Sequence, residues 1–456
     1  MASKTLEGRS TATAEAPFTL DEPAPRTLGL LDQLGLWGNL GVSILGFTGA
    51  FYILLPTGYP PALSLGAALL ALLFGTIVGT AAVALVAVAG TETGQPTMVL
   101  LRGLLGARLS WLPTVLNVTQ LIGWTTFELV TISTAMHQIT PGIDRWVYVV
   151  AGGVITTVLA LRPLGWIRVL RRYVTVLVVI ALGYLAVQLL RNPLPSLGHG
   201  SWHGFWIAVD TVIAAAVSFA PMAADYSRHS NSVRNGALGT FVGYSVTQIA
   251  CYGIGLVALL TVAKSGDQTQ MFNAFMAVPV GTLAFAVLAV RELDQSFVDT
   301  YSSAISIQNI RPRWDRRVLA LLLGTLATVF ALVLTVSAYE NFLVLLGAVF
   351  VPLLGVLVVD YFVVSRRAWD LSETARTRWL ILLPWLAGFV VYQLINPGYV
   401  VWWQTMWLHI DSWVGFTPAT WMSASILSFL VAALVTLPVG VLEKRLAAGA
   451  QPARAR

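Results

Sequence analysis

The sequence predicts an all-helical membrane protein with about twelve spans. Of its 456 residues, 57% are hydrophobic and only 11% are charged, and the mean hydropathy is +0.76. A water-facing polar surface could not cover a chain of this composition. About a dozen apolar stretches approach the roughly 20 residues that cross a hydrocarbon core as a helix. None shows the period-two alternation of membrane barrel strands, so we expect helices.

The connectors between these stretches alternate between arginine-rich and arginine-poor. The rich set includes the turns with Arg102, Arg171, Arg316 and Arg376, whereas the poor set holds only a few cations, such as Arg145. Cytoplasmic loops retain Lys and Arg, which predicts an even number of crossings with both termini in the cytoplasm. Orientation and anionic membrane lipid therefore explain the net charge of +6 better than nucleic-acid binding does.

The order of segments follows from composition. Residues 1–28 are polar and are expected to form a flexible cytoplasmic tail, and residues 446–456 a second one. The predicted spans are 33–55, 62–89, 109–137, 145–161, 173–190, 205–224, 237–263, 273–305, 318–338, 341–364, 379–396 and 418–442.

Two spans contain residues that interrupt a plain lipid-facing helix. The first reads GLWGNLGVSILGFTG, with the polar pair Asn39 and Ser43 among glycines. The sixth reads VSFAPMAADYSR, where Pro221 frees carbonyls near Ser218. Freed backbone groups in a bilayer must be satisfied by protein, water or solute, so paired interruptions point to the midplane site of a secondary transporter. Close helix packing by small residues is the alternative interpretation of the glycines.

Four stretches resemble the nucleobase-cation symporter family, whose members carry cytosine, purines, allantoin and hydantoins. They are GTETGQPTMVLLRGLLGARLSWLP, QLIGW, VSFAPMAADYSR and LDQSFVDTYSSAISIQN, in the family's order. The resemblance implies a core of ten helices over residues 29–365, built from inverted repeats at about 33–190 and 205–364. Its helices 1 and 6 would be broken, and two peripheral helices would occupy residues 366–445.

The resemblance also implies a substrate site between spans 1, 3, 6 and 8. The family holds a planar heterocycle between two aromatic residues, which match Trp124 and Phe219 here, and stacking on such faces is favourable. Gln120 lies one helical turn before Trp124, where its amide can read a ring edge. Ser218 matches a span 6 contact. From the broken first span we expect contributions from Gly38, Asn39 and Ser43.

The expected coupling site departs from the sodium-coupled members of the family. Arg291 and Glu292 stand where those relatives carry hydroxyl residues, and an arginine cannot supply the oxygen that a hard cation needs. We therefore predict that Arg291 replaces the sodium ion against the carbonyls of span 1, and that protons drive transport. Glu292 and then Glu128 are the candidate proton carriers, because a carboxylate within a membrane span indicates function. We expect no metal site and no cofactor.

The predicted function is import of a nucleobase, cytosine or a purine, or a similar planar heterocycle by alternating access across a bacterial-type cytoplasmic membrane. A carrier of hydantoin, allantoin or a vitamin-like ring is the nearest alternative. An intramembrane enzyme is the alternative from another class, although the sequence has no HExxH or GxSxG motif. A passive channel would differ from either in showing flux that does not saturate.

Overall fold

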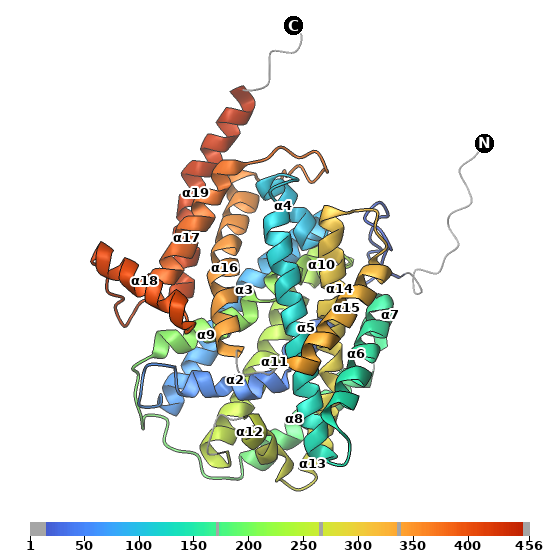
Figure 1. The fold of residues 1–456 in the computed structure, drawn as a ribbon, viewed down its shortest axis with the longest axis vertical. Helices are drawn as coiled ribbons and strands as arrows, with labels where there is room; N and C mark the ends of the chain where they lie inside the picture. The colour runs from blue at the N-terminus through green and yellow to red at the C-terminus, as the bar shows by residue number, and fades with distance from the viewer. Residues whose placement is uncertain (1–14, 170–172, 264–267, 335–338, 450–456) are drawn as a thin grey trace, which may run out of the picture.

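The computed structural model describes residues 15–169, 173–263, 268–334 and 339–449. These residues form a helical bundle (Figure 1). The elements are α1 (Leu30–Leu40), α2 (Ile44–Leu54), α3 (Leu65–Thr93), α4 (Thr97–Leu105), α5 (Trp111–Ile139), α6 (Arg145–Leu161), α7 (Pro163–Val169), α8 (Thr175–Leu189), α9 (Phe205–Val217), η3 (Ala220–Met222), α10 (Ala223–Ser227), α11 (Val233–Thr261), α12 (Gln268–Met276), α13 (Gly281–Arg291), α14 (Leu293–Ile310), α15 (Arg316–Val333), α16 (Tyr339–Val359), η5 (Asp360–Val364), η6 (Trp379–Ile381), α17 (Leu382–Ile395), α18 (Val401–Val414) and α19 (Ala424–Gly449).

The first predicted span is broken, as expected. Helix α1 ends at Leu40, α2 begins at Ile44, and the two are bent by 60°. Gly41 stands at the break, where a Cβ atom would lie 2.8 Å from the carbonyl oxygen of Tyr244 in α11. Only glycine lets the two backbones approach this closely, so the close-packing interpretation and the break both apply to this span.

The sixth span is broken too. Helix α9 ends at Val217, and the chain continues through the short 3₁₀ helix η3, with Pro221 inside it, into α10. Proline has no backbone N–H and cannot continue the hydrogen-bond ladder of α9. The predicted pair of broken helices 1 and 6 is therefore confirmed.

The single span expected at 273–305 is wrong. This segment forms three helices, α12, α13 and α14, and the last two are separated at Glu292. Val280, with a φ of 53°, precedes α13. Glu292 itself keeps helical backbone angles, and its N–H donates to the Leu288 carbonyl at 3.2 Å, so α13 and α14 follow one another almost without interruption. The larger interruption lies between α12 and α13, at residues 277–280. Helices α4, α7 and α18 also lie outside every predicted span.

By length and apolar composition, six described helices could cross a membrane, or up to eight if each of two bent pairs counts as one span. The twelve expected spans are thus not matched one for one by long apolar helices. The first span passes only when its two bent halves are counted together, whereas the sixth passes as one stretch over Phe205–Ser227. Helix α5 does not pass, and it carries buried polar residues such as Asn117, Gln120 and Glu128.

Arginine-rich connectors gather at the end of the bundle that carries α4, called here the α4 end; α12 lies at the other end (Figure 1). Arg102 donates to Asn309 at the end of α14, and Arg316 donates to the carbonyl of Ala160 at the end of α6. Arg378 donates to the carbonyl of Gly103. Connectors far apart in sequence therefore share one side, as their alternation predicts.

The described part of the N-terminal segment packs on this end of the bundle instead of extending as a flexible tail. Glu15 accepts hydrogen bonds from the backbone of Leu164 and Gly165, and Leu28 donates to the carbonyl of His229. Its polar groups find partners because backbone ends of α7 and α10 are open there. Residues 1–14 and 450–456 lie outside the described residues, and residues 446–449 continue α19.

Helices α17 and α19 pack beside α16, with α18 outermost (Figure 1). Asp210, buried in α9, accepts hydrogen bonds from the Ser423 hydroxyl and from the backbone N–H groups of Ala424 and Ser425. A carboxylate at a helix N-terminus satisfies its open donors. Asp210 therefore fastens the C-terminal helices to the core.

Candidate functional site

Gln120 connects α5 to the break in the sixth span. Its amide nitrogen donates to the carbonyl of Ser218, at 3.3 Å, and to the side-chain oxygen of Asn117, at 2.8 Å. Asn117 in turn donates to the Ser306 hydroxyl of α14 and to the carbonyl of Pro221. Spans 3, 6 and 8 thus meet at one polar network, and α5 amides satisfy the carbonyls that the break leaves open.

The amide oxygen of Gln120 is buried and has no hydrogen-bond partner among the described residues. A buried acceptor without a donor costs about 1 to 3 kcal/mol, so such an atom points to a missing partner. The two contacts of the amide nitrogen fix this oxygen in place. Gln120 therefore presents an unpaired acceptor in the interior of the bundle, and its contact with substrate stays a prediction.

The two predicted stacking residues are neighbours in sequence of the residues in this network, and each is 7% exposed. Trp124 stands one turn after Gln120 on α5, and Phe219 directly follows Ser218. Their neighbours differ. Trp124 packs edge-on against Tyr339 and Phe342 at the start of α16, whereas Phe219 packs against other rings.

Phe219 has its ring centroid 6.5 Å from that of Trp37 in α1 and 5.0 Å from that of Tyr244 in α11. These two residues, with Tyr339 and Phe342 behind Trp124, extend the aromatic surroundings of the site. None of these four residues was predicted from the sequence. Trp37 lies within the interrupted first span and could have been singled out there, but the other three carry no local signal.

Arg291 lies where the sequence places it against span 1. Its guanidinium, 2% exposed as a residue, donates to the backbone carbonyl of Asn39 in the last turn of α1. It also donates to the Glu292 carboxylate at 3.2 Å and to the Gln295 side-chain oxygen at 3.5 Å. The charge of this arginine is effectively permanent. The three acceptors offset part of the cost of burying that charge inside the bundle.

Glu292 binds the other side of the same break. Its carboxylate accepts the Ser43 hydroxyl at 2.6 Å and the backbone N–H of Ile44, the first residue of α2, at 3.3 Å. The cation thus meets the C-terminal end of α1, and the anion meets the N-terminal end of α2. Each charge complements the helix dipole that it faces.

The remaining residues predicted from span 1 lie in this ionic cluster or on other helices. The Asn39 amide nitrogen donates to the Thr175 hydroxyl of α8, at 2.8 Å, and Ser43 binds Glu292. Gly38 faces α11, since a Cβ atom on it would stand 3.8 Å from the Gly243 carbonyl oxygen. The described contacts of Gly38, Asn39 and Ser43 are therefore with neighbouring helices, and their contact with substrate stays a prediction.

Glu128, the third coupling candidate, lies one turn after Trp124 and is fully buried. Neither of its carboxyl oxygens has a hydrogen-bond donor among the described residues. Its surroundings are described further below.

Comparison with known proteins identifies the family. The sequence model of the family described as a permease for cytosine and purines, uracil, thiamine and allantoin matches residues 52–380.

The chain belongs to this permease family.

Individual relatives agree with the match. The permease is 23% identical to the cytosine permease of Escherichia coli strain K12 over 330 residues, which cover 68% of this chain and 76% of that protein. Among solved structures it is similar to Mhp1, a nucleobase-cation-symport-1 family transporter, in a closed conformation with bromovinylhydantoin bound. The TM-score is 0.75 at 16% identity, over 95% of this chain and 96% of that one.

An inward-facing conformation of Mhp1 gives a TM-score of 0.69 at 17% identity, over 95% and 94% of the two chains. A Na⁺-coupled sialic acid symporter gives 0.63 at 11% identity, over 94% and 93%. These likenesses confirm the predicted transporter fold. Family and fold together make the permease a multi-pass membrane transporter.

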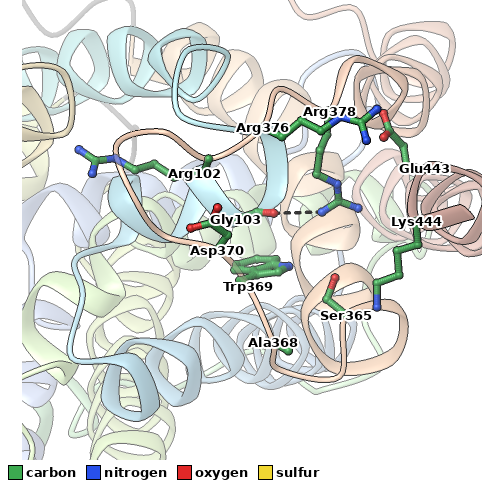
Figure 2. A pocket seen from close by; sticks show the side chains of 11 residues that line it. Arg102, Gly103, Ser365, Ala368, Trp369, Asp370, Arg376, Arg378, Glu443 and Lys444 are labelled. Carbon is green, nitrogen blue, oxygen red and sulfur yellow. Dashed lines mark hydrogen bonds between the residues drawn. The ribbon is translucent and has the colours of Figure 1, made fainter. Parts of the chain in front are cut away.

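A cavity of about 210 Å³ lies away from the predicted site, at the α4 end of the permease. Figure 2 shows its lining, where Arg378 reaches Gly103 beside Trp369. Arg378 also pairs with the buried Asp360 at 2.6 Å, and Lys444 donates to the carbonyl of Val364. The charged groups of Arg378 and Lys444 therefore bond to other parts of the protein and join segments of the fold around this cavity.

Proposed function

We propose that the permease imports a nucleobase, cytosine or a purine, or a similar planar heterocycle by alternating access. The observation that carries this proposal is the buried amide oxygen of Gln120, which has no hydrogen-bond partner among the described residues. Its amide nitrogen bonds to Ser218, the neighbour of Phe219, and Trp124 follows one turn later on α5. A planar ring with an N–H edge can satisfy that acceptor and stack on an aromatic face. The description of the family and the related cytosine permease support the same substrate class.

Coupling to protons in place of sodium is the second part of the proposal. Arg291 supports it, because its guanidinium already neutralises the carbonyl end of α1 and offers no ligand oxygen to a cation. An arginine keeps its proton throughout the transport cycle, so a carboxyl must be the group that binds and releases the transported proton.

The proposed orientation places the α4 end and both termini in the cytoplasm of a bacterial-type membrane. The arginine-rich connectors gathered at that end support it, because such loops resist translocation.

Uptake by purified protein in proteoliposomes tests the proposal. Labelled cytosine is offered with unlabelled purines, uracil, allantoin, hydantoin and thiamine as competitors. We expect saturable uptake that an inward proton gradient stimulates and that does not depend on sodium. Flux that does not saturate would indicate a channel and contradict the proposal. If allantoin, hydantoin or thiamine competes most strongly with labelled cytosine, the permease carries one of these alternative heterocycles.

A further inference from the structure

A second carboxyl faces Glu128 in the interior of the bundle. Helices α5 and α14 pack along one another, and across their interface the Glu128 carboxyl meets the carboxyl of Asp299. Glu128 is 0% exposed and Asp299 is 2% exposed. Of this pair, only Glu128 was predicted from the sequence, because no local pattern joins residues 171 positions apart.

Hydrogen bonds from neighbouring groups do not satisfy Glu128. Both its oxygens lack a donor in the part of the chain that the structure describes. Ser296 is close by, but its hydroxyl donates to the Glu292 backbone carbonyl, at 3.4 Å. Besides that hydroxyl, the group placed to share hydrogen with the Glu128 carboxyl is the carboxyl of Asp299. A hydrogen bond between two carboxyls requires a proton on one of them.

The charged and titratable groups around the pair have other partners. Glu292 also faces the pair, but it is bound to Arg291 and to α2. On α10, Tyr226 faces Asp299, and its hydroxyl donates to the Val298 carbonyl at 2.9 Å. Asp294 lies nearer Arg291, at the start of α14.

Other helices that pack on α5 and α14 bring no cation to the pair among their described contacts. Arg145 of α6 donates to the Ala331 carbonyl, Arg316 of α15 to the Ala160 carbonyl, and Arg102 of α4 to Asn309. Helices α2 and α12 contain no charged residue. Two carboxylates in contact, without a cation and out of water, repel too strongly to be ionised together.

We propose that Glu128 and Asp299 form the coupling site and hold the transported proton between them. With the proton bound, one carboxyl donates to the other and α5 packs against α14. When the proton leaves, two carboxylates face each other and drive the helices apart. No electron moves and no bond to carbon changes. This inference rests on the proposed function, since it names the group that performs proton coupling.

The pair is placed to link proton binding to substrate binding. Asn117, Gln120, Trp124 and Glu128 follow one face of α5 at helical spacing. Asp299 stands two turns before Ser306 on α14, which accepts the Asn117 amide. The interface that the proton closes is therefore the one that positions Gln120 and Trp124 around the ligand. Proton and heterocycle favour the same packing of α5 against α14, which is the differential interaction that coupling requires.

Conservative variants test the pair. Glu128→Gln and Asp299→Asn keep the size of each side chain and mimic its neutral form. We expect each to lose accumulation of cytosine driven by an inward proton gradient, while exchange of internal for external cytosine continues. Asp294→Asn is the matched control, because it removes a buried carboxyl from the same helix; it should keep gradient-driven accumulation.

A measurement on the unmodified protein guards against variants that fail to fold. Cytosine binding in detergent should release or take up protons in weakly buffered solution, and an infrared difference spectrum should show a protonated carboxyl band that either substitution removes. Retained gradient-driven accumulation in both variants, or its loss in Asp294→Asn, would overturn the carboxyl pair and leave heterocycle uptake standing. Sodium-driven uptake, or no saturable uptake by the unmodified protein, would overturn the proposed function and this inference together.

Discussion

Arg291 donates a hydrogen bond from its guanidinium to the backbone carbonyl of Asn39, across the interface between α13 and α1. The contact joins residues 252 positions apart and stabilises the open end of a broken helix. A fixed positive charge therefore lies at the break in the first span, as the proposal of proton coupling requires. Predictions about substrate, coupling and stability follow from this arrangement and from the α5 face beside it.

Replacing Trp124 or Phe219 with alanine should abolish saturable uptake, because the ring would lose its stacking faces, each worth about 0.5 to 1.5 kcal/mol beyond burial. Trp124→Phe should keep part of the affinity, since a smaller face still stacks. Uptake kinetics and membrane expression are measured together. Trp413→Ala, which changes a tryptophan 88% exposed on α18, is the control. Near-normal apparent affinity in both alanine variants would show that these two residues do not bind the substrate.

Gln120→Leu should weaken binding by roughly 1 to 3 kcal/mol, or about five- to a hundred-fold, because a ligand donor loses its acceptor. The Ser218 carbonyl also loses its donor. Competition assays with several heterocycles measure the effect, and the order of preference should change. An equal loss for every ring would instead assign Gln120 to packing of α5 against the sixth span.

Arg291→Ala should stop uptake and should not create sodium dependence, since the variant leaves Glu292 buried without its cation. Arg291→Lys keeps the charge but loses the planar fork that reaches Asn39, Glu292 and Gln295 together, so it should restore only part of the activity. Uptake is compared in sodium and in choline buffers. Sodium-dependent uptake that persists in Arg291→Ala contradicts this account of coupling.

Ser43→Ala should reduce uptake less than Glu292→Gln does. The first substitution removes one hydroxyl from the Glu292 carboxylate, whereas the second also weakens its bond to the Ile44 N–H and its pairing with Arg291. Loss of one hydrogen bond to a charged group costs about 1.5 to 3 kcal/mol. Thermal unfolding in detergent and uptake are measured for both. A larger loss in Ser43→Ala would assign that hydroxyl to substrate, as its sequence position suggests.

Arg378→Ala should destabilise the protein without changing substrate affinity. It leaves Asp360, a fully buried carboxylate, without its cation, which costs roughly 3 to 5 kcal/mol. The melting temperature in detergent should fall, while the affinity of folded protein for cytosine should not. If the affinity for cytosine changes while the melting temperature does not, the cavity at the α4 end takes part in transport.

Much of the architecture could be predicted because hydropathy and helix breaking act within a few residues. The apolar stretches, the breaks near Gly41 and Pro221 and the turn that separates Gln120 from Trp124 follow from local patterns. The error at 273–305 has the same origin. That segment is apolar enough to suggest one span, yet the chain turns between α12 and α13, where Val280 has a φ of 53°, and a hydropathy window does not detect such a turn.

The sequence by itself determined the class of protein, the two broken helices and the residue types of the site, since these depend on composition and spacing. Only the tertiary structure decided which groups meet: Arg291 with Asn39, Phe219 with Trp37, and Glu128 with Asp299. Each of these pairs joins helices far apart in the chain. Their contact depends on how the whole bundle packs, where one rotation of a helix exchanges a buried partner for lipid, and no short-range pattern in the sequence encodes that choice.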